Sequence, residues 1–430
     1  HPMLCTTKKL PKGMVEVSCE IPLDEIKNEL EAAVRQLSEQ KPIQGFRPGK
    51  APADVVKARF GEMAVYEAAL PAVVRKHFVK AITENKIHSY GEPGINVTKL
   101  APGNPIAFTA TVAAVPDVTS LADFRKVKVA AKQPVVEDAK VDGALKDLQH
   151  MHTKEVRASR EARDKDKIVV DMDLSLAGVP LDGGQARNHG IYLDEDYYIP
   201  GLKEKVLGMK EGEKREFTLK FLDTHYQKMI AGKDVGFAVT LKEVYELQHP
   251  PIDDALAKTV GQESLEKLRT LIKTNMQTEA DEKERQRMEL EILDTLVEKS
   301  KFDDVPEKIL SDEVSRMLEE LKHGVTERGG SFEDYLGSIK KTLDELRLEF
   351  MPQAVKRVKT AILIRELGEK ENVEVGDSEV LEEVQKLMNQ YANDAEVQKQ
   401  IRTEDYQDYI RSSLRNRKVL SMLRDAAVKK

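Results

Sequence analysis

Hydrophobic positions in the first part of the chain alternate with polar ones, then recur at helical spacing, then alternate again. The first alternation, over residues 12–21, predicts a strand, and Asp24 is predicted to be the N-cap of the helix that follows. Helical spacing then continues and is interrupted by an irregular loop. Two further strands are predicted at 95–100 and 106–115, joined by a turn rich in Gly and Pro. This order predicts an α+β domain over residues 1–115.

The middle of the chain returns to a period of two after a linker. Residues 116–159 are predicted to form this linker, as a short extended piece and one helix. Alternation then marks three segments, at 168–176, 217–221 and 237–241. Because strands with one apolar face commonly pair as antiparallel sheets, residues 160–246 are predicted to form a small antiparallel β domain.

After two consecutive prolines at 250 and 251, apolar residues keep a helical spacing to the end of the chain. Residues 247–430 are therefore predicted to form an all-α domain. The first of its helices has apolar ends and a highly charged centre, which suggests an arm that projects and packs only in places. The predicted helices run over 265–297, 306–323, 332–349, 352–370, 377–391 and 404–428. The fold class predicted for the whole chain is multidomain α+β.

Composition narrows the classes of function. Charged residues make up 33% of the chain and aromatic residues 5%, which fits a helix-rich, well-solvated protein better than a compact enzyme core. A formal net charge of -7 argues against a DNA partner, so contact with any nucleic acid requires a local basic patch. No apolar run approaches the roughly 20 residues of a membrane span, and no leader-like segment opens the chain. These features predict a cytoplasmic protein with no membrane partner.

The cysteines and histidines show no spacing typical of a metal site or a catalytic site. Cys5 and Cys19 are too few for a disulfide framework, and Cys19 occupies an inward-facing strand position where a structural role is expected. His150 and His152 are two residues apart on a predicted helix and therefore point to different faces. No Ser/His/Asp or Cys/His grouping can be assembled from spacing. The sequence thus predicts no metal site and no cofactor.

One irregular loop carries the clearest sign of function. Its two glycines and two prolines favour backbone angles that interrupt helices. A Phe held beside Arg and Lys suits docking on a surface that offers phosphate charge and an apolar niche. The alternative is a helix connector whose Phe folds back into the core. A nucleotide-binding loop is disfavoured because the glycines are one residue too close and no Ser or Thr follows the Lys. The segment reads Gly45-Phe46-Arg47-Pro48-Gly49-Lys50-Ala51-Pro52.

Taken together, these features resemble trigger factor, a family of ribosome-associated bacterial chaperones. The resemblance covers essentially the whole chain, and the loop is its most specific element, with Pro48 where family members often have Lys. It implies docking beside the tunnel exit of the large ribosomal subunit, on a ribosomal protein and nearby rRNA. It also implies a helical chaperone domain that forms a cradle with two arms. The docking residues implied by the resemblance are Gly45, Phe46, Arg47, Pro48, Gly49 and Lys50.

The β domain resembles FKBP-type prolyl isomerases, which implies a peptidyl-prolyl cis-trans isomerase. The resemblance rests on Asp171, on glycines 183 and 184, on the segment Ile199-Pro200-Gly201 and on Phe237. Met172 and Leu202 stand where aromatic residues are usual in these isomerases. A β domain that serves as a spacer or as a client surface, without catalysis, therefore stays an alternative. The prolyl pocket implied by the resemblance is lined by Asp171, Met172, Ile199, Leu202, Tyr226 and Phe237.

The predicted function is that of an ATP-independent chaperone that shields nascent and unfolded polypeptides and keeps them open for folding or export. One alternative is primarily a prolyl isomerase whose helical parts recruit substrates, and another is a scaffold of long charged helices. Whether the free protein forms a homodimer stays open. Apolar groups on the predicted helices suit either client binding or internal packing. These groups are Ile309, Leu310, Met317, Leu318 and Leu321; Ile362 and Ile364; and Leu387, Met388 and Tyr391.

Overall fold

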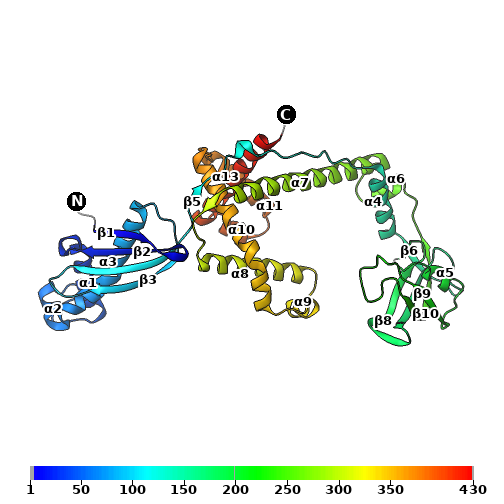
Figure 1. Ribbon diagram of the computed structural model, residues 1–430, viewed down its shortest axis with the longest axis horizontal. Helices are drawn as coiled ribbons and strands as arrows, with labels where there is room; N and C mark the ends of the chain where they lie inside the picture. The colour runs from blue at the N-terminus through cyan, green and yellow to red at the C-terminus, as the bar shows by residue number, and fades with distance from the viewer. Residues whose placement is uncertain (1–3, 198, 429–430) are drawn as a thin grey trace. The chain divides into compact units, whose positions relative to one another are not determined.

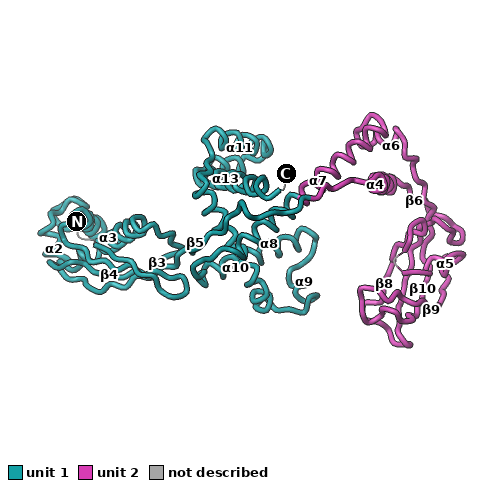
Figure 2. Tube along the Cα trace, turned by 45° about the horizontal axis from the view of Figure 1, so that its top comes forward, with its two compact units in different colours: residues 1–131, 285–430 teal, residues 132–284 magenta. Residues whose placement is uncertain are grey.

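The computed structural model describes residues 4–197 and 199–428. The chain divides into two compact units, one made of residues 1–131 and 285–430 and the other of residues 132–284 (Figure 2). The first three residues of the predicted domain 1–115 and the last two of the predicted domain 247–430 lie outside the described residues.

The first unit opens with an antiparallel sheet in the strand order β1-β2-β4-β3 (Figure 1). Side chains of β2 alternate between buried and more exposed positions, as expected for a strand with one face on a core. That core, between sheet and helices, includes Val17, Ile21, Val73 and Phe108. The strands are β1 (Cys5–Lys9), β2 (Met14–Ile21), β3 (Ser89–Lys99) and β4 (Ile106–Ala114); the helices are α1 (Lys27–Gln40), α2 (Ala53–Phe60) and α3 (Glu62–Glu84).

Two helix boundaries differ from the sequence predictions. Asp24 is not an N-cap, because it lies in a 3-10 turn and α1 begins only after Ile26, without a side-chain cap. The turn places the Ile26 side chain in the core, and this burial sets where the helix starts. The helical pattern after the loop is also split, between α2 and α3. The break falls at Gly61, whose φ of 90° suits glycine and few other residues.

A disulfide joins Cys5 to Cys19, a single link that the sequence analysis, which predicted no disulfide framework, did not anticipate. β1 pairs with β2 in a register that places the two residues opposite each other. The sequence did not reveal β1, since its side chains are mostly exposed and polar, and without that strand Cys19 had no visible partner. Cys19 itself is buried, in agreement with its predicted inward position.

The remainder of the first unit is helical, with one core formed where α7, α10 and α13 pack and residues such as Leu296, Leu363 and Val419 meet. A helix break predicted near Pro352 does not occur. Buried side chains on both sides of the proline, Leu346 and Ala354, pack in a single cluster with α8 and hold the helix together. The elements are β5 (Val118–Ser120), α7 (Leu265–Lys299, of which residues 265–284 belong to the second unit), β11 (Lys301–Phe302), α8 (Glu307–Glu327), α9 (Phe332–Ile339), α10 (Leu343–Lys370), α11 (Asp377–Gln390), α12 (Ala395–Ile401) and α13 (Glu404–Ala427).

The second unit contains an antiparallel sheet in the order β6-β10-β7-β8, with β9 also paired to β10. Its core collects the inward residues of β7 and β10, among them Ile168, Val170, Val239 and Leu241. β6 and β8 were not predicted, because most of their side chains are exposed and no clear alternation marks them. The elements are α4 (Asp138–Met151), β6 (Lys154–Arg157), β7 (Lys167–Leu176), β8 (Val179–Tyr192), α5 (Leu202–Val206), β9 (Lys214–Lys220), β10 (Asp234–Gln248) and α6 (Asp254–Thr259).

The predicted fold class, multidomain α+β with antiparallel sheets and a helical C-terminal part, is confirmed. Within the described part of the chain, none of the helices combines the length and the apolar character that crossing a bilayer requires.

Candidate functional site

The predicted docking loop lies between α1 and α2, and its backbone is anchored by Ser38. This buried serine, near the end of α1, accepts hydrogen bonds from the backbone nitrogens of Gly49 (3.0 Å) and Ala51 (3.4 Å). Gly49 has a φ of 79°, and a Cβ atom there would lie 2.8 Å from the Glu39 side chain. Both the backbone angle and the close approach therefore require glycine.

Two backbone turns present the loop's aromatic and cationic residues to solvent. The Phe46 nitrogen donates to the Ile43 carbonyl (3.1 Å), and the Lys50 nitrogen donates to the Arg47 carbonyl (2.9 Å). The Phe46 side chain is 41% exposed and does not join the hydrophobic core of the domain. Among the residues that the structure describes, neither Arg47 nor Lys50 has an ion-pair partner. The loop is thus a fixed backbone with free functional groups.

Four of the residues predicted to line the prolyl pocket meet in one buried cluster. Met172 comes from β7, Ile199 and Leu202 come from the segment that opens α5, and Phe237 comes from β10. All four are part of the hydrophobic core of the β domain. The fold therefore brings these residues together, whereas Asp171 and Tyr226 lie outside the cluster.

Asp171 holds three strands together. It precedes Met172 on β7 and so points to the opposite face of the sheet. Its Oδ1 accepts from the Asn188 backbone nitrogen (2.9 Å), and its Oδ2 lies 3.3 Å from Nζ of Lys242 on β10. The hydrogen bond from the Asn188 N–H lowers the pKa of the Asp171 carboxyl below its usual value, and the Lys242 ammonium lowers it further. Partial burial of the carboxyl acts in the opposite direction and is the weaker effect. The carboxylate is thus occupied in joining β7 to β8 and β10.

Aromatic side chains that the sequence did not assign to the pocket extend from Phe237 to the surface. The Phe217 ring stacks on Phe237 with 5.4 Å between centroids, and Phe221 lies 6.1 Å from Phe237. His225 lies 4.9 Å from Phe221 and stacks at 4.5 Å on Tyr226, which is 79% exposed. Alternation had marked Phe217 and Phe221 as strand residues only, because their proximity to Phe237 depends on the pairing of β9 with β10.

The same region offers a hydrogen-bond donor and a hollow. The Gln227 backbone nitrogen donates to Nδ1 of His225 (3.1 Å), so the proton of the neutral ring lies on Nε2. That buried Nε2 has no hydrogen-bond partner within the described residues. A cleft of about 520 Å³ is lined by side chains that include Leu174, Phe217 and Phe237. Polar residues such as Asp173 and Glu216 also line the cleft, and its aromatic rings offer the apolar contact that suits a proline ring.

The apolar groups predicted on the helices mostly pack internally. Ile309, Met317, Leu318 and Ile362 are buried, and Leu310, Leu321, Ile364 and Leu387 pack partly buried against the helical cores. Tyr391 is exposed. Other apolar side chains of this region, outside the predicted groups, reach solvent: Leu348 is 74% exposed, and Leu381 and Tyr409 are each 64% exposed.

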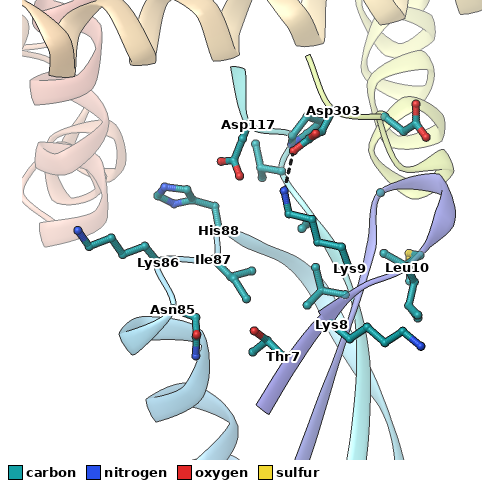
Figure 3. A pocket seen from close by; sticks show the side chains of 17 residues that line it. Thr7, Lys8, Lys9, Leu10, Asn85, Lys86, Ile87, His88, Asp117 and Asp303 are labelled. Atoms are coloured by element: carbon teal, nitrogen blue, oxygen red, sulfur yellow. Dashed lines mark hydrogen bonds and ion pairs between the residues drawn. The ribbon is translucent and has the colours of Figure 1, made fainter. Parts of the chain in front are cut away.

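A polar hollow of about 310 Å³ in the first unit contains none of the predicted site residues. Figure 3 shows the Lys9 ammonium reaching across it to the Asp303 carboxylate, at 3.3 Å. Lys86, His88 and Asp117 line its other side (Figure 3). The hollow therefore belongs to the connection between the sheet domain and the segment around Asp303, away from the docking loop.

In the second unit the fold brings together side chains that suit a metal ion. One ligand atom from each of His150, Asp194 and His249 lies within 4.8 Å of the others. The sequence had offered only His150 beside His152. His249 is 99 positions from His150 in the numbering, so no local spacing could have revealed the pair.

An α+β domain with an exposed loop, an antiparallel β domain with an aromatic cleft and a helical remainder define a multidomain protein of the folding-factor class. A model of FKBP-type peptidyl-prolyl cis-trans isomerases matches residues 158–242. A model of the bacterial trigger factor protein matches residues 3–148, and a second model, of the trigger factor C-terminus, matches residues 264–425. The chain belongs to the trigger factor family. A chaperone role follows from that membership, and the isomerase-type domain is present at the level of the family.

Individual relatives match over nearly the full length. The trigger factor of Carboxydothermus hydrogenoformans is 30% identical over 427 residues, covering 99% of each chain. That of Pelotomaculum thermopropionicum is 27% identical over 424 residues, covering 98% of this chain and 96% of the relative. A solved structure of a trigger factor chaperone covers 98% of this chain and 99% of its own, with 22% identity and a TM-score of 0.46.

Proposed function

We propose that this chain docks on the large ribosomal subunit at the tunnel exit and shields emerging polypeptides without using ATP. Docking is assigned to residues 1–115 and client holding to residues 247–430 with the linker 116–159. Residues 160–246 are assigned prolyl isomerisation. The proposal places the protein in the cytoplasm, in part on ribosomes, with a ribosomal protein and nearby rRNA as docking partners.

The observation that carries the docking proposal is the loop. Its backbone is held by Ser38 and by two turns, so the backbone that carries Phe46, Arg47 and Lys50 loses little conformational freedom on binding. The two cations have no ion pair to break within the described residues. Arg and Lys pair with phosphate oxygens, and such contacts release counterions and weaken as salt rises. Phe46 supplies the apolar part of the contact.

Client holding is supported by exposed apolar side chains on the helices. Leu348, Leu381 and Tyr409 reach solvent on α10, α11 and α13. Isolated apolar contacts among charged neighbours bind weakly and exchange quickly, which suits a chaperone that releases its client without a nucleotide cycle. The sequence contains no nucleotide-binding loop that fits the required spacing.

The test of docking replaces Phe46-Arg47-Pro48 with three alanines in the full chain and measures co-sedimentation with ribosomes. We expect binding to be abolished while the circular dichroism spectrum is unchanged. A matched control replaces Tyr226-Gln227-Lys228 with three alanines, which likewise removes one exposed aromatic residue and one cation, and should leave binding intact. Undiminished co-sedimentation of the loop variant would refute the docking proposal.

A second test adds charge instead of removing it. Pro48→Lys places a third cation in the loop, and we expect tighter ribosome binding with a steeper dependence on salt concentration. Binding that is unchanged at low salt would mean that the loop does not contact phosphates.

The isomerase proposal rests on the cleft beside Phe217 and Phe237. The residues assigned to prolyl isomerisation are Asp171, Met172, Ile199, Leu202, Tyr226 and Phe237, of which Phe237 lines this cleft. Uncatalysed X-Pro isomerisation takes tens to hundreds of seconds, so a protease-coupled proline-peptide assay detects modest catalysis. A rate equal to background would leave the domain a spacer or client surface. The triple-alanine docking variant should keep full isomerase activity.

A further inference from the structure

We propose that His150, Asp194 and His249 form a binding site for a divalent transition-metal ion of the zinc class. The three side chains come from the last turn of α4, from the segment after β8 and from the residue after β10. One ligand atom of each lies within 4.8 Å of the others. All three belong to the second unit.

The hydrogen bonds of His249 determine which of its nitrogens can bind a cation. While the Thr153 hydroxyl donates its only proton to the Gln149 carbonyl (2.8 Å), it accepts from the His249 Nδ1 at 2.6 Å. In that arrangement Nδ1 carries the proton of the neutral ring, and Nε2 carries a lone pair. That Nε2 lies 3.0 Å from the Oδ2 of Asp194. Two acceptors at this distance repel each other unless a cation or an extra proton lies between them.

His150 is oriented in the same manner by a different partner. Its Nε2 lies 3.3 Å from the Oε1 of Glu195, and its Nδ1 lies 3.9 Å from the Oδ2 of Asp194. A proton on Nε2 is thus shared with the Glu195 carboxylate, and the Nδ1 lone pair faces Asp194. A histidine that binds a metal with one nitrogen and donates to a carboxylate with the other is the usual arrangement of protein metal sites.

Asp194 supplies the charge at the centre. Its side chain is only 8% exposed, and its Oδ1 is buried with no hydrogen-bond partner within the described residues. A carboxylate in that position needs a positive charge close by. Two imidazoles whose lone pairs face it supply none while they are neutral. A bound cation would satisfy the carboxylate and both imidazoles at once.

The distances and the donor set indicate which ions fit. Ligands at about 2.0–2.2 Å from a tetrahedral ion lie roughly 3.3 Å apart, and the two measured separations, 3.0 and 3.9 Å, lie on either side of that value. Two imidazole nitrogens with one carboxylate favour Zn²⁺, Co²⁺, Ni²⁺ or Cu²⁺ over Mg²⁺ and Ca²⁺, which take oxygen ligands. Three protein ligands leave one position for water.

Metal binding would join segments of the second unit and stabilise its fold. Gln149 already donates from its Nε2 to the Pro250 carbonyl at 2.7 Å, beside His249. A metal ion would add a stronger link between the end of α4, the segment that follows β8 and the residue that follows β10. Because an ion bound only by the folded state stabilises that state, the unfolding temperature of the second unit should rise with metal concentration.

The test titrates the full chain, first freed of metal with a chelator, with ZnCl₂ in a calorimeter. We expect one equivalent to bind, and a parallel titration with MgCl₂ to give no heat. Asp194→Asn and His249→Gln should lower the zinc affinity at least 100-fold. Thr153→Val, which removes only the partner that orients His249, should lower it roughly 10–100-fold. His152→Gln, at the C-cap of the same helix but outside the cluster, should bind like the unaltered protein.

Two further measurements make the outcome independent of folding defects. Far-UV circular dichroism of each variant without metal must match that of the unaltered chain. The Co²⁺ complex should show the visible absorption of a tetrahedral site, and His150→Gln should abolish it. Absence of zinc binding, or an affinity unchanged in His249→Gln, overturns the proposal and leaves a protonated imidazole paired with Asp194.

Discussion

The docking loop and the prolyl cleft are built on opposite plans. In the loop, glycine and a buried serine fix the backbone, and the side chains proposed to dock, Phe46 and Arg47, project freely. At the proposed prolyl site, most of the assigned residues, such as Leu202 and Phe237, are also part of the core of their domain. In the loop, the residues that hold the backbone differ from those proposed to make the contact, whereas at the prolyl site the same residues form the core and the proposed site.

This difference has consequences for mutation. Loop side chains can be replaced with little effect on stability, because they contact few other residues. Pocket residues cannot, because removing a buried side chain leaves a cavity as well as a lost contact. A loss of isomerase activity in a core variant therefore does not by itself identify a catalytic contact, whereas a loss of ribosome binding in a loop variant does identify a docking contact.

The largest effect is expected from Leu202→Ala, in the buried cluster assigned to the prolyl site. Leu202 is fully buried in the core of the β domain. Its truncation should destabilise that domain by about 2–5 kcal/mol. Hydrogen exchange of the β7 and β10 amides in the full chain measures this, and ribosome binding should not change. The matched control is Leu222→Ala, because that leucine is 57% exposed and should alter stability by less than about 0.5 kcal/mol. Equal protection in both variants would mean that Leu202 is not a core residue.

A smaller effect is expected from Ser38→Ala, which removes the anchor of the loop and none of its exposed side chains. Two backbone donors, of Gly49 and Ala51, lose their acceptor, at a cost of roughly 1–3 kcal/mol. Ribosome binding should weaken but persist, because the docking side chains remain. Gln36→Ala, on an exposed position of the same helix, serves as the control in the same co-sedimentation assay. Complete loss of binding in Ser38→Ala would mean that the fixed backbone matters more than the side chains.

The same contrast determines what the sequence could predict. The loop is a local feature, and its Gly, Pro and cationic residues can be read from consecutive letters. Alternation and helical spacing located β2, β7 and most helices, because each has one buried face. Exposed strands such as β8 left no such pattern. Partners that meet only in three dimensions were also hidden, as with Cys5 opposite Cys19 and His150 beside His249.

The smallest effect is expected at Asp171, which supports the cleft from the outer face of the sheet. Its carboxyl has a pKa below the usual value because it accepts from the Asn188 N–H and lies beside Lys242. A depressed pKa means that the folded state binds the proton less tightly than the unfolded state does. The stabilisation is therefore complete above about pH 4, the usual pKa of Asp, and is lost as the pH falls through the lower folded-state value.

Asp171→Asn removes this charge and keeps an oxygen that can accept from Asn188. We expect it to lower the stability of the β domain slightly at neutral pH and to match the unaltered chain in strong acid, where Asp171 is protonated. Urea unfolding followed from pH 2 to pH 7 tests this, with Asp182→Asn, an exposed carboxylate on β8, as the control. A difference that stays constant with pH would show that Asp171 acts through the shape of its side chain and its hydrogen bond, and not through its charge.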